Sequence, residues 1–202
     1  MKTYKLAIVG ATGLVGRTAL KVLEEKKIPN IEYTLFSSNK SAGTKLKFMN
    51  DDYIVHELKD SSFDKHFDFA IFSAGAETSK HFAPIAAAKG CIVIDNSSAF
   101  RMDDDVPLIV PEVNFKDIVS HKNIISNPNC STIQAVIALK PLDDKYKIKR
   151  IVYSTYQAVS GAGKLGLEDL ENGRAKTELP LLKFSHPIFD NCLRKIDVFL
   201  LN

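Results

Sequence analysis

The residue in this sequence best suited to covalent chemistry is Cys130, within the run NPNCST at 127–132. The run follows a short apolar stretch and precedes a helical pattern, which predicts a thiol at the start of a helix. A helix N-terminus favours an anion, and thiolate is the form that attacks an acyl carbon. A lone cysteine is also common in protein cores, but the helix start and the polar neighbours favour reactivity. Cys91 and Cys192 are interpreted as structural or incidental.

A second pattern with chemical meaning is GATGLVG at 10–16, between an apolar run at 4–9 and a helical pattern at 14–27. Glycines at such a turn let the backbone approach a pyrophosphate, and the helix N-terminus supplies N–H donors and a positive dipole. In this strand–turn–helix context the pattern predicts a dinucleotide-binding loop, with a simple glycine-rich turn as the alternative.

The end of the second predicted strand favours NADP over NAD. Folds that bind NAD usually carry Asp or Glu there for the ribose 2′-hydroxyl, but residues 36–41 read FSSNKS and contain no acid. Glu32 lies at the opposite end of the strand. Lys40 with flanking hydroxyls suits a 2′-phosphate, and the alternative is an exposed loop lysine without a ligand.

Apolar runs that alternate with helical patterns predict the fold that must position these residues. Helices are predicted at 14–27, 78–89, 163–174 and 131–140, the last ended by Pro141. Strands are predicted at 4–9, 31–37, 68–73, 91–95, 108–110, 123–126 and 148–159, with a hairpin over 44–58. The alternation predicts an α/β fold with a Rossmann-type, doubly wound and mostly parallel sheet. The apolar run 196–201 reads as a further strand, so we expect a second domain that is incomplete.

Composition narrows the class of protein. The 202 residues are 45% hydrophobic and 25% charged, which is ordinary for a globular chain. A net charge of +3, with scattered basic residues, argues against a nucleic-acid or membrane surface. No apolar run approaches the ~20 residues that span a bilayer. Three distant cysteines favour free thiols in a reducing compartment. We therefore expect a cytoplasmic protein, and no metal site is predicted.

Seven blocks of the sequence, in order, resemble the aspartate-β-semialdehyde dehydrogenase family. They are GATGLVG at 10–16, SNKSAG at 38–43, FSAG at 72–75, DNSSAFR at 95–101, VPEVN at 110–114, SNPNCST at 126–132 and STYQAVSGAG at 154–163. The resemblance implies NADPH-dependent reductive dephosphorylation of β-aspartyl phosphate to aspartate β-semialdehyde through a cysteine thioester. It places the reaction in lysine, threonine and methionine biosynthesis. It also implies small-molecule substrates, no nucleic-acid or membrane partner, and a homo-oligomer in the full-length family.

The resemblance implies roles for individual residues. Cys130 matches the nucleophile, Asn129 a residue that lines the reacting centre, and Gln157 the residue that orients the acyl end of the substrate. Arg101 matches the arginine that binds phosphate or the phosphoryl group, and the alternative is a surface arginine paired with the acids at 103–105. The implied cofactor site comprises Gly10, Thr12, Gly13, Leu14 and Val15 for the pyrophosphate, Ser38, Lys40 and Ser41 for the 2′-phosphate, and Ser73, Gly75, Ser160 and Gly161.

The resemblance also implies a division of the chain into an NADP-binding domain, 1–130, and the beginning of a catalytic and dimerisation domain, 131–202. The family's catalytic histidine, second substrate arginine and phosphate-binding lysine match no position in these 202 residues. The five histidines, at 56, 66, 81, 121 and 186, lie outside matching blocks. Because a general acid–base group contributes roughly 10²–10⁴ in rate, we expect low or no turnover from these residues alone.

Two other functions share some of these features. N-acetyl-γ-glutamyl-phosphate reductase resembles this chain in loop, cysteine and chemistry, but the PNCST and STYQAVSGAG blocks favour the aspartyl enzyme. A non-catalytic NADP-binding module or sensor would keep the glycine loop. It would have no use for Cys130, Gln157 and Arg101.

Overall fold

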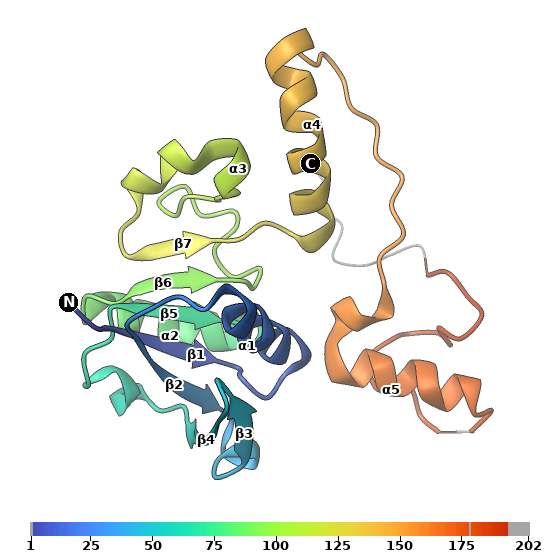
Figure 1. Ribbon diagram of the computed structural model, residues 1–202. Helices are drawn as coiled ribbons and strands as arrows, with labels where there is room; N and C mark the ends of the chain where they lie inside the picture. The colour runs from blue at the N-terminus through green and yellow to red at the C-terminus, as the bar shows by residue number, and fades with distance from the viewer. Residues whose placement is uncertain (1, 178, 194–202) are drawn as a thin grey trace. The chain divides into compact units, whose positions relative to one another are not determined.

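The computed structural model describes residues 2–177 and 179–193 of the chain (Figure 1). The chain divides into two compact units, Met1–Ile151 and Val152–Asn202. The strands are β1 (Tyr4–Val9), β2 (Ile31–Ser37), β3 (Lys45–Phe48), β4 (Asp51–Glu57), β5 (Phe69–Phe72), β6 (Ile92–Asp95) and β7 (Ile124–Ser126). The α-helices are α1 (Leu14–Lys26), α2 (Ala76–Ala88), α3 (Pro111–Asn114), α4 (Cys130–Tyr146) and α5 (Gly163–Arg174). Short 3₁₀ helices are η1 (Asn39–Ser41), η2 (Asp60–Phe63), η3 (Phe115–Ser120) and η4 (Val159–Ala162). A functional domain boundary after residue 130 stays a prediction.

The seven strands form one sheet in the order β3-β4-β2-β1-β5-β6-β7. Neighbours from β4 through β7 are parallel, and β3 pairs with β4 in the antiparallel sense. The predicted hairpin and the mostly parallel Rossmann-type sheet are therefore confirmed. The chain winds outward in both directions from β1 and β5, and ligands of such sheets bind at the carboxyl ends of the strands at this switch point.

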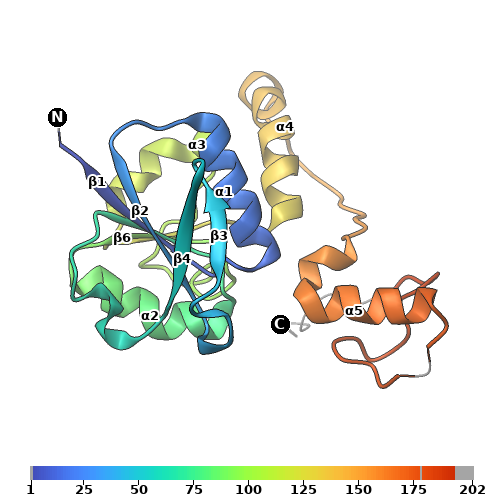
Figure 2. The ribbon, with the colours of Figure 1, turned by 60° about the horizontal axis from the view of Figure 1, so that its bottom comes forward.

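Helices α1 and α2 lie on opposite faces of this sheet (Figure 2). Side chains alternate along a strand, so successive residues of β1 face opposite layers. Leu6 and Ile8 belong to the apolar cluster that includes residues of α1. Ala7 and Val9 belong to the cluster that includes residues of α2. Burial on both faces explains why the central strands read as continuous apolar runs.

Helix α4 continues past Pro141 to Tyr146, so the prediction that Pro141 ends this helix is wrong. A proline inside a helix removes one N–H donor, but other contacts hold the last turn. Lys140 and Asp144 form an ion pair one turn apart. The backbone and side chain of Asp143 accept hydrogen bonds, of 2.9 and 3.1 Å, from the two N–H groups that follow the helix.

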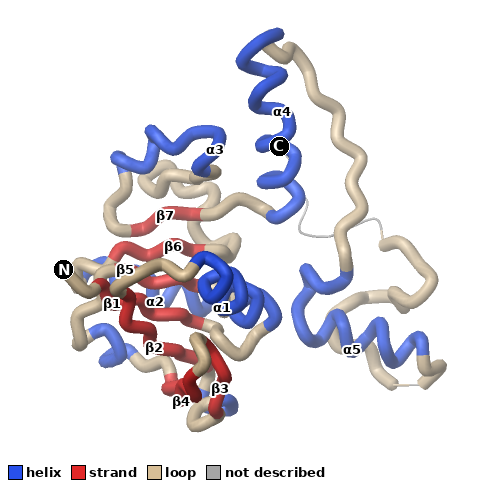
Figure 3. Tube along the Cα trace, viewed as in Figure 1, coloured by secondary structure: helices blue, strands red, loops and turns tan. Residues whose placement is uncertain are grey.

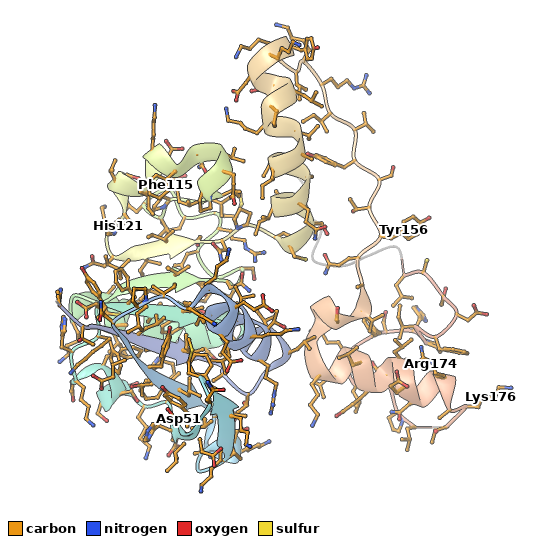
Figure 4. All side chains as sticks on the ribbon, viewed as in Figure 1. Asp51, Phe115, His121, Tyr156, Arg174 and Lys176 are labelled. Carbon is orange, nitrogen blue, oxygen red and sulfur yellow. The ribbon has the colours of Figure 1, made fainter. Side chains whose placement is uncertain are left out.

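The strand predicted at 148–159 is wrong. Residues 147–158 form a loop (Figure 3), and the 3₁₀ helix Val159–Ala162 follows. Tyr156, labelled in Figure 4, is 89% exposed. β-Branched and aromatic residues favour strands, but a strand also needs the backbone groups of a neighbour, and among the described residues this segment joins no sheet. The strand predicted at 108–110 is reduced to a bridge between Leu108 and Ser126. The run 196–201 lies outside the described residues.

A buried carboxylate organises the second unit. Asp169 of α5 is 3% exposed and accepts backbone hydrogen bonds from Leu182, Lys183 and Phe184 at 2.7, 2.8 and 3.0 Å. These donors, Leu182 first, hold the pKa of Asp169 below its ordinary value. The predicted helix at 163–174 is confirmed, and its buried acid fixes the segment that follows.

Candidate functional site

A cavity of about 490 Å³ lies at the carboxyl ends of β1, β2 and β5. This is the switch point of the sheet, and the volume is within the usual range of ligand pockets. The cavity is lined by Val9, Gly10, Thr12, Gly13, Ser37, Ser38, Leu58, Ser73, Ala74, Thr78 and Phe82. Five residues of the predicted cofactor site are among them: Gly10, Thr12, Gly13, Ser38 and Ser73.

Two glycines allow the tight turn from β1 into α1. Gly10 has a φ of +86°, and a Cβ there would lie 2.7 Å from the carbonyl oxygen of Ser73. A Cβ on Gly16 would lie 2.1 Å from the carbonyl oxygen of Gly10. The loop therefore packs directly against the start of α1 and the end of β5, as a backbone that approaches a pyrophosphate requires.

The end of β2 supplies hydroxyls to the same cavity. The hydroxyls of Thr12 and Ser37 are hydrogen-bonded to each other at 2.7 Å. Ser38 begins the 3₁₀ turn η1, which carries Lys40 and Ser41, and the Lys40 side chain is exposed. None of the described residues that line the cavity is Asp or Glu. A 2′-phosphate at the end of β2 would therefore meet the hydroxyls of these lining residues, with Lys40 in the turn that follows.

Cys130 is exposed and is the first residue of α4, as the sequence predicted. Asn129 caps the helix, because its Oδ1 accepts a hydrogen bond of 2.9 Å from the N–H of Ser131. Cys91 differs: it is 1% exposed, and burial, with a smaller effect of Asp68, raises the pKa of its thiol to about 12. The accessible thiol at a helix start is thus the one in the NPNCST run.

Arg101 is tied to the segment that leads into Cys130. Its Nε donates to the carbonyl of Asn127 at 2.8 Å, and its Nη2 donates to the carbonyl of Asn96 at 3.2 Å. Asp105, one of the acids at 103–105 weighed as partners of Arg101, forms an ion pair with Lys122 at 2.8 Å. The guanidinium therefore lies between the loops that follow β6 and β7.

The second unit brings Gln157 together with the turn at 160–161. A Cβ on Gly161 would lie 2.7 Å from Nε2 of Gln157, so this side chain lies directly against the turn. The N–H of Gly161 donates to the carbonyl of Ala158 at 3.0 Å. Ser160, also predicted as a cofactor contact, belongs to the same 3₁₀ turn, η4.

The remaining predicted residues lie around the glycine loop. Leu14 and Val15, in the first turn of α1, are 50% and 48% exposed. Gly75 precedes α2 with a φ of +91°. Sequence reasoning missed the cavity residues Thr78 and Phe82. Their spacing of four places them on one face of α2, directly after the FSAG block, and this was the available signal.

Within residues 2–177 and 179–193, no group of three or more His, Cys, Asp or Glu side chains is arranged to hold a metal ion. In those same ranges, no helix has both the length and the apolar character needed to cross a membrane.

The sheet order, the glycine loop and the cavity at the switch point define a Rossmann-type dinucleotide-binding protein. The family model of the semialdehyde dehydrogenase NAD binding domain matches residues 5–121. The model of the semialdehyde dehydrogenase dimerisation domain matches residues 139–202. The chain belongs to the semialdehyde dehydrogenase family.

Known proteins confirm the resemblance to aspartate-semialdehyde dehydrogenases. That of Aquifex aeolicus is 55% identical over 203 residues, which cover 97% of this chain and 60% of the relative. Aspartate semialdehyde dehydrogenase II of Vibrio cholerae, crystallised with ASA, superposes with a TM-score of 0.91 at 43% identity. The match covers 99% of this chain and 61% of the Vibrio chain. The Candida albicans enzyme with NADP has a TM-score of 0.62 at 30% identity, over 73% and 48% of the two chains. The chain thus spans about 60% of the length of the Aquifex relative.

Proposed function

We propose that this chain carries the NADP-binding and thiol-bearing part of an aspartate-semialdehyde dehydrogenase, which converts β-aspartyl phosphate to aspartate β-semialdehyde. The observation that carries the proposal is the exposed Cys130 at the start of α4, with Arg101 bound to the loop three residues before it. The ASA complex of the Vibrio cholerae relative supports the substrate class.

The residues around the cavity fit NADP. The glycine loop with Thr12 and Gly13 would hold the pyrophosphate, because the N-terminus of α1 offers N–H groups and a positive dipole. Ser38, Lys40 and Ser41 would hold the 2′-phosphate, at the end of β2, where no residue that lines the cavity is Asp or Glu. When bound, NADPH supplies the hydride that reduces the acyl group. The NADP complex of the Candida albicans relative supports this assignment.

The chain's own residues account for the acyl-transfer half of the reaction. The thiolate of Cys130 attacks the acyl carbon, the C–S bond forms, and the bond from that carbon to the phosphate oxygen breaks. Arg101 binds the phosphoryl group and then the released phosphate, since guanidinium pairs well with such anions. The resemblance assigns Asn129, next to Cys130, to the lining of the reacting centre, and it assigns orientation of the acyl group to Gln157.

Acylation of the thiol tests this proposal without requiring the whole catalytic cycle. The protein is mixed with β-aspartyl phosphate in the absence of NADPH, and intact mass spectrometry follows the addition of one aspartyl group. We expect the adduct on Cys130, its loss in Cys130→Ser, and its retention in Cys192→Ser, which removes the other exposed thiol. Absence of the adduct would refute the aspartyl assignment, and preferential acylation by N-acetyl-γ-glutamyl phosphate would favour the related reductase.

The wider biological context stays a prediction. A cytoplasmic location follows from the composition and the distant cysteines, and lysine, threonine and methionine biosynthesis and a homo-oligomer follow from the resemblance. The match to the family's dimerisation domain at 139–202 supports the last of these.

A further inference from the structure

A buried carboxylate lies directly behind the loop that carries Arg101. Asp95, the last residue of β6, is 0% exposed. Its carboxylate accepts hydrogen bonds from the Ser79 hydroxyl of α2 at 2.6 Å, and from the N–H and hydroxyl of Ser97 at 3.1 and 2.7 Å. A buried charge is costly unless such donors compensate it. The three bonds make Asp95 the anchor of the chain that leaves β6.

The hydroxyl of Ser97 connects the Asp95 carboxylate to the turn that follows β6. While it donates to Asp95, its oxygen accepts a hydrogen bond of 3.0 Å from the N–H of Ala99. Arg101 then closes the loop from its far end, because its Nη2 donates to the carbonyl of Asn96 at 3.2 Å. The segment 96–101 is therefore held at both ends, by the carboxylate and by the guanidinium.

The same loop contacts the strand end that leads to the thiol. Asn127 donates from its N–H to the carbonyl of Asp95 at 2.8 Å, and its own carbonyl accepts from Nε of Arg101 at 2.8 Å. The side-chain amide of Asn127 also donates to Oδ1 of Asn96 at 3.3 Å. Cys130 is three positions after Asn127, which is at most about 11 Å of extended chain.

We propose that Asp95 and Ser97 are positioning residues, which hold the Arg101 charge beside Cys130 so that it attracts an anionic acyl donor to the thiol. The inference rests on the proposed function, in which the donor is an acyl phosphate. Arginine has many rotamers, so without a fixed loop its guanidinium would occupy many positions in the solvent and would not stay near the thiol. The carboxylate does not touch the substrate and acts through the turn.

Two alkylating reagents of similar size measure this charge at the thiol. Iodoacetate is an anion and iodoacetamide is neutral, so the ratio of their rates at Cys130 reports local potential, while thiol exposure and basicity largely cancel. The measurement is made in a Cys192→Ser background, since Cys192 is the other exposed thiol and Cys91 is buried. Peptide mapping confirms that Cys130 carries the label.

The expected pattern separates positioning from general destabilisation. Arg101→Ala lowers the iodoacetate-to-iodoacetamide ratio about three- to tenfold, the effect expected when one charge is removed from within roughly 10 Å of the thiol. Ser97→Ala also lowers the iodoacetate-to-iodoacetamide ratio. Ser79→Ala, which removes a hydroxyl bond to the same carboxylate from the α2 side, leaves the ratio unchanged. In Asp95→Asn the loss of a negative charge would by itself raise the ratio, so a fall reports a displaced guanidinium.

The proposal is overturned if folded Ser97→Ala keeps the parent ratio, if Ser79→Ala lowers it as much as Ser97→Ala, or if Asp95→Asn raises it. An unchanged ratio in Arg101→Ala would also overturn it, and would leave acylation of Cys130 by the aspartyl donor intact as a separate result. Conversely, the expected ratios without acylation would refute the proposed function alone.

Discussion

Replacing Gly16 by alanine should damage the glycine loop through a single steric contact. A Cβ at this position would lie 2.1 Å from the carbonyl oxygen of Gly10, 2.8 Å from its carbonyl carbon and 2.9 Å from Cα of Ala11. All three neighbours are backbone atoms, so no side-chain rotation relieves the overlap. The start of α1 must move away from the loop by about 1 Å to restore ordinary contact distances.

The magnitude follows from what such a movement disturbs. Gly16 is buried in α1 together with Leu20 and Leu23, which pack in the apolar cluster on one face of the sheet. Overpacking of a well-packed core costs about 1–3 kcal/mol, and a backbone overlap lies at the upper end. Alanine regains about 1 kcal/mol of helix propensity relative to glycine. We therefore expect a net loss of about 2 kcal/mol in the free energy of unfolding.

Urea unfolding followed by circular dichroism measures this loss, and calorimetry with NADP measures the effect on the cavity. For the unfolding measurement Gly13→Ala is the matched control, because its Cβ would lie 3.3 Å from the same Gly10 oxygen and its φ of −73° suits any residue. We expect the control to stay within about 1 kcal/mol of the parent. Equal stabilities of Gly16→Ala and the parent would refute the steric argument.

Four further predictions concern the N-cap of α4, the affinity for NADP, the stability of the fold at low pH and the rate of turnover. Asn129→Ala should lower stability by about 1 kcal/mol in urea unfolding, since it removes the N-cap of α4. Lys40→Ala should weaken NADP binding about tenfold in calorimetry and leave NAD binding unchanged. The N–H of Lys5, and next the Lys2 ammonium, hold the pKa of Asp68 at about 2, below its ordinary 3.8. This stabilisation exists above the unfolded-state pKa and disappears as pH falls through the folded-state value, so the stability advantage of the parent over Asp68→Asn should shrink between about pH 4 and pH 2. The resemblance implies a catalytic histidine that matches no position in these 202 residues, so we expect them alone to turn over roughly 10²–10⁴ times more slowly than the Aquifex aeolicus relative; comparable rates in an NADPH-linked assay would contradict this.

Sequence patterns predicted an element correctly where the residues of that segment alone determine its structure. The first strand, the glycine turn and α1 follow from an apolar run, fixed glycine spacing and a helical face. The hairpin β3-β4 follows from its turn-prone residues at 50–52. Prediction failed at Pro141 and at 148–159, because the first depends on contacts after the proline and the second on a partner strand.

By itself, the sequence determined the alternation of the sheet strands with α1, α2 and α4, the glycine loop and the thiol at a helix start, because each depends on residues close together in the chain. Only the tertiary structure decided that Thr78 and Phe82 join the glycine loop around one cavity. It alone also brought Ser79 of α2 to the carboxylate of Asp95 and Arg101 to the loop before Cys130. These contacts join segments separated by many residues, and hydrogen-bond partners at such range are selected by the packing of the sheet.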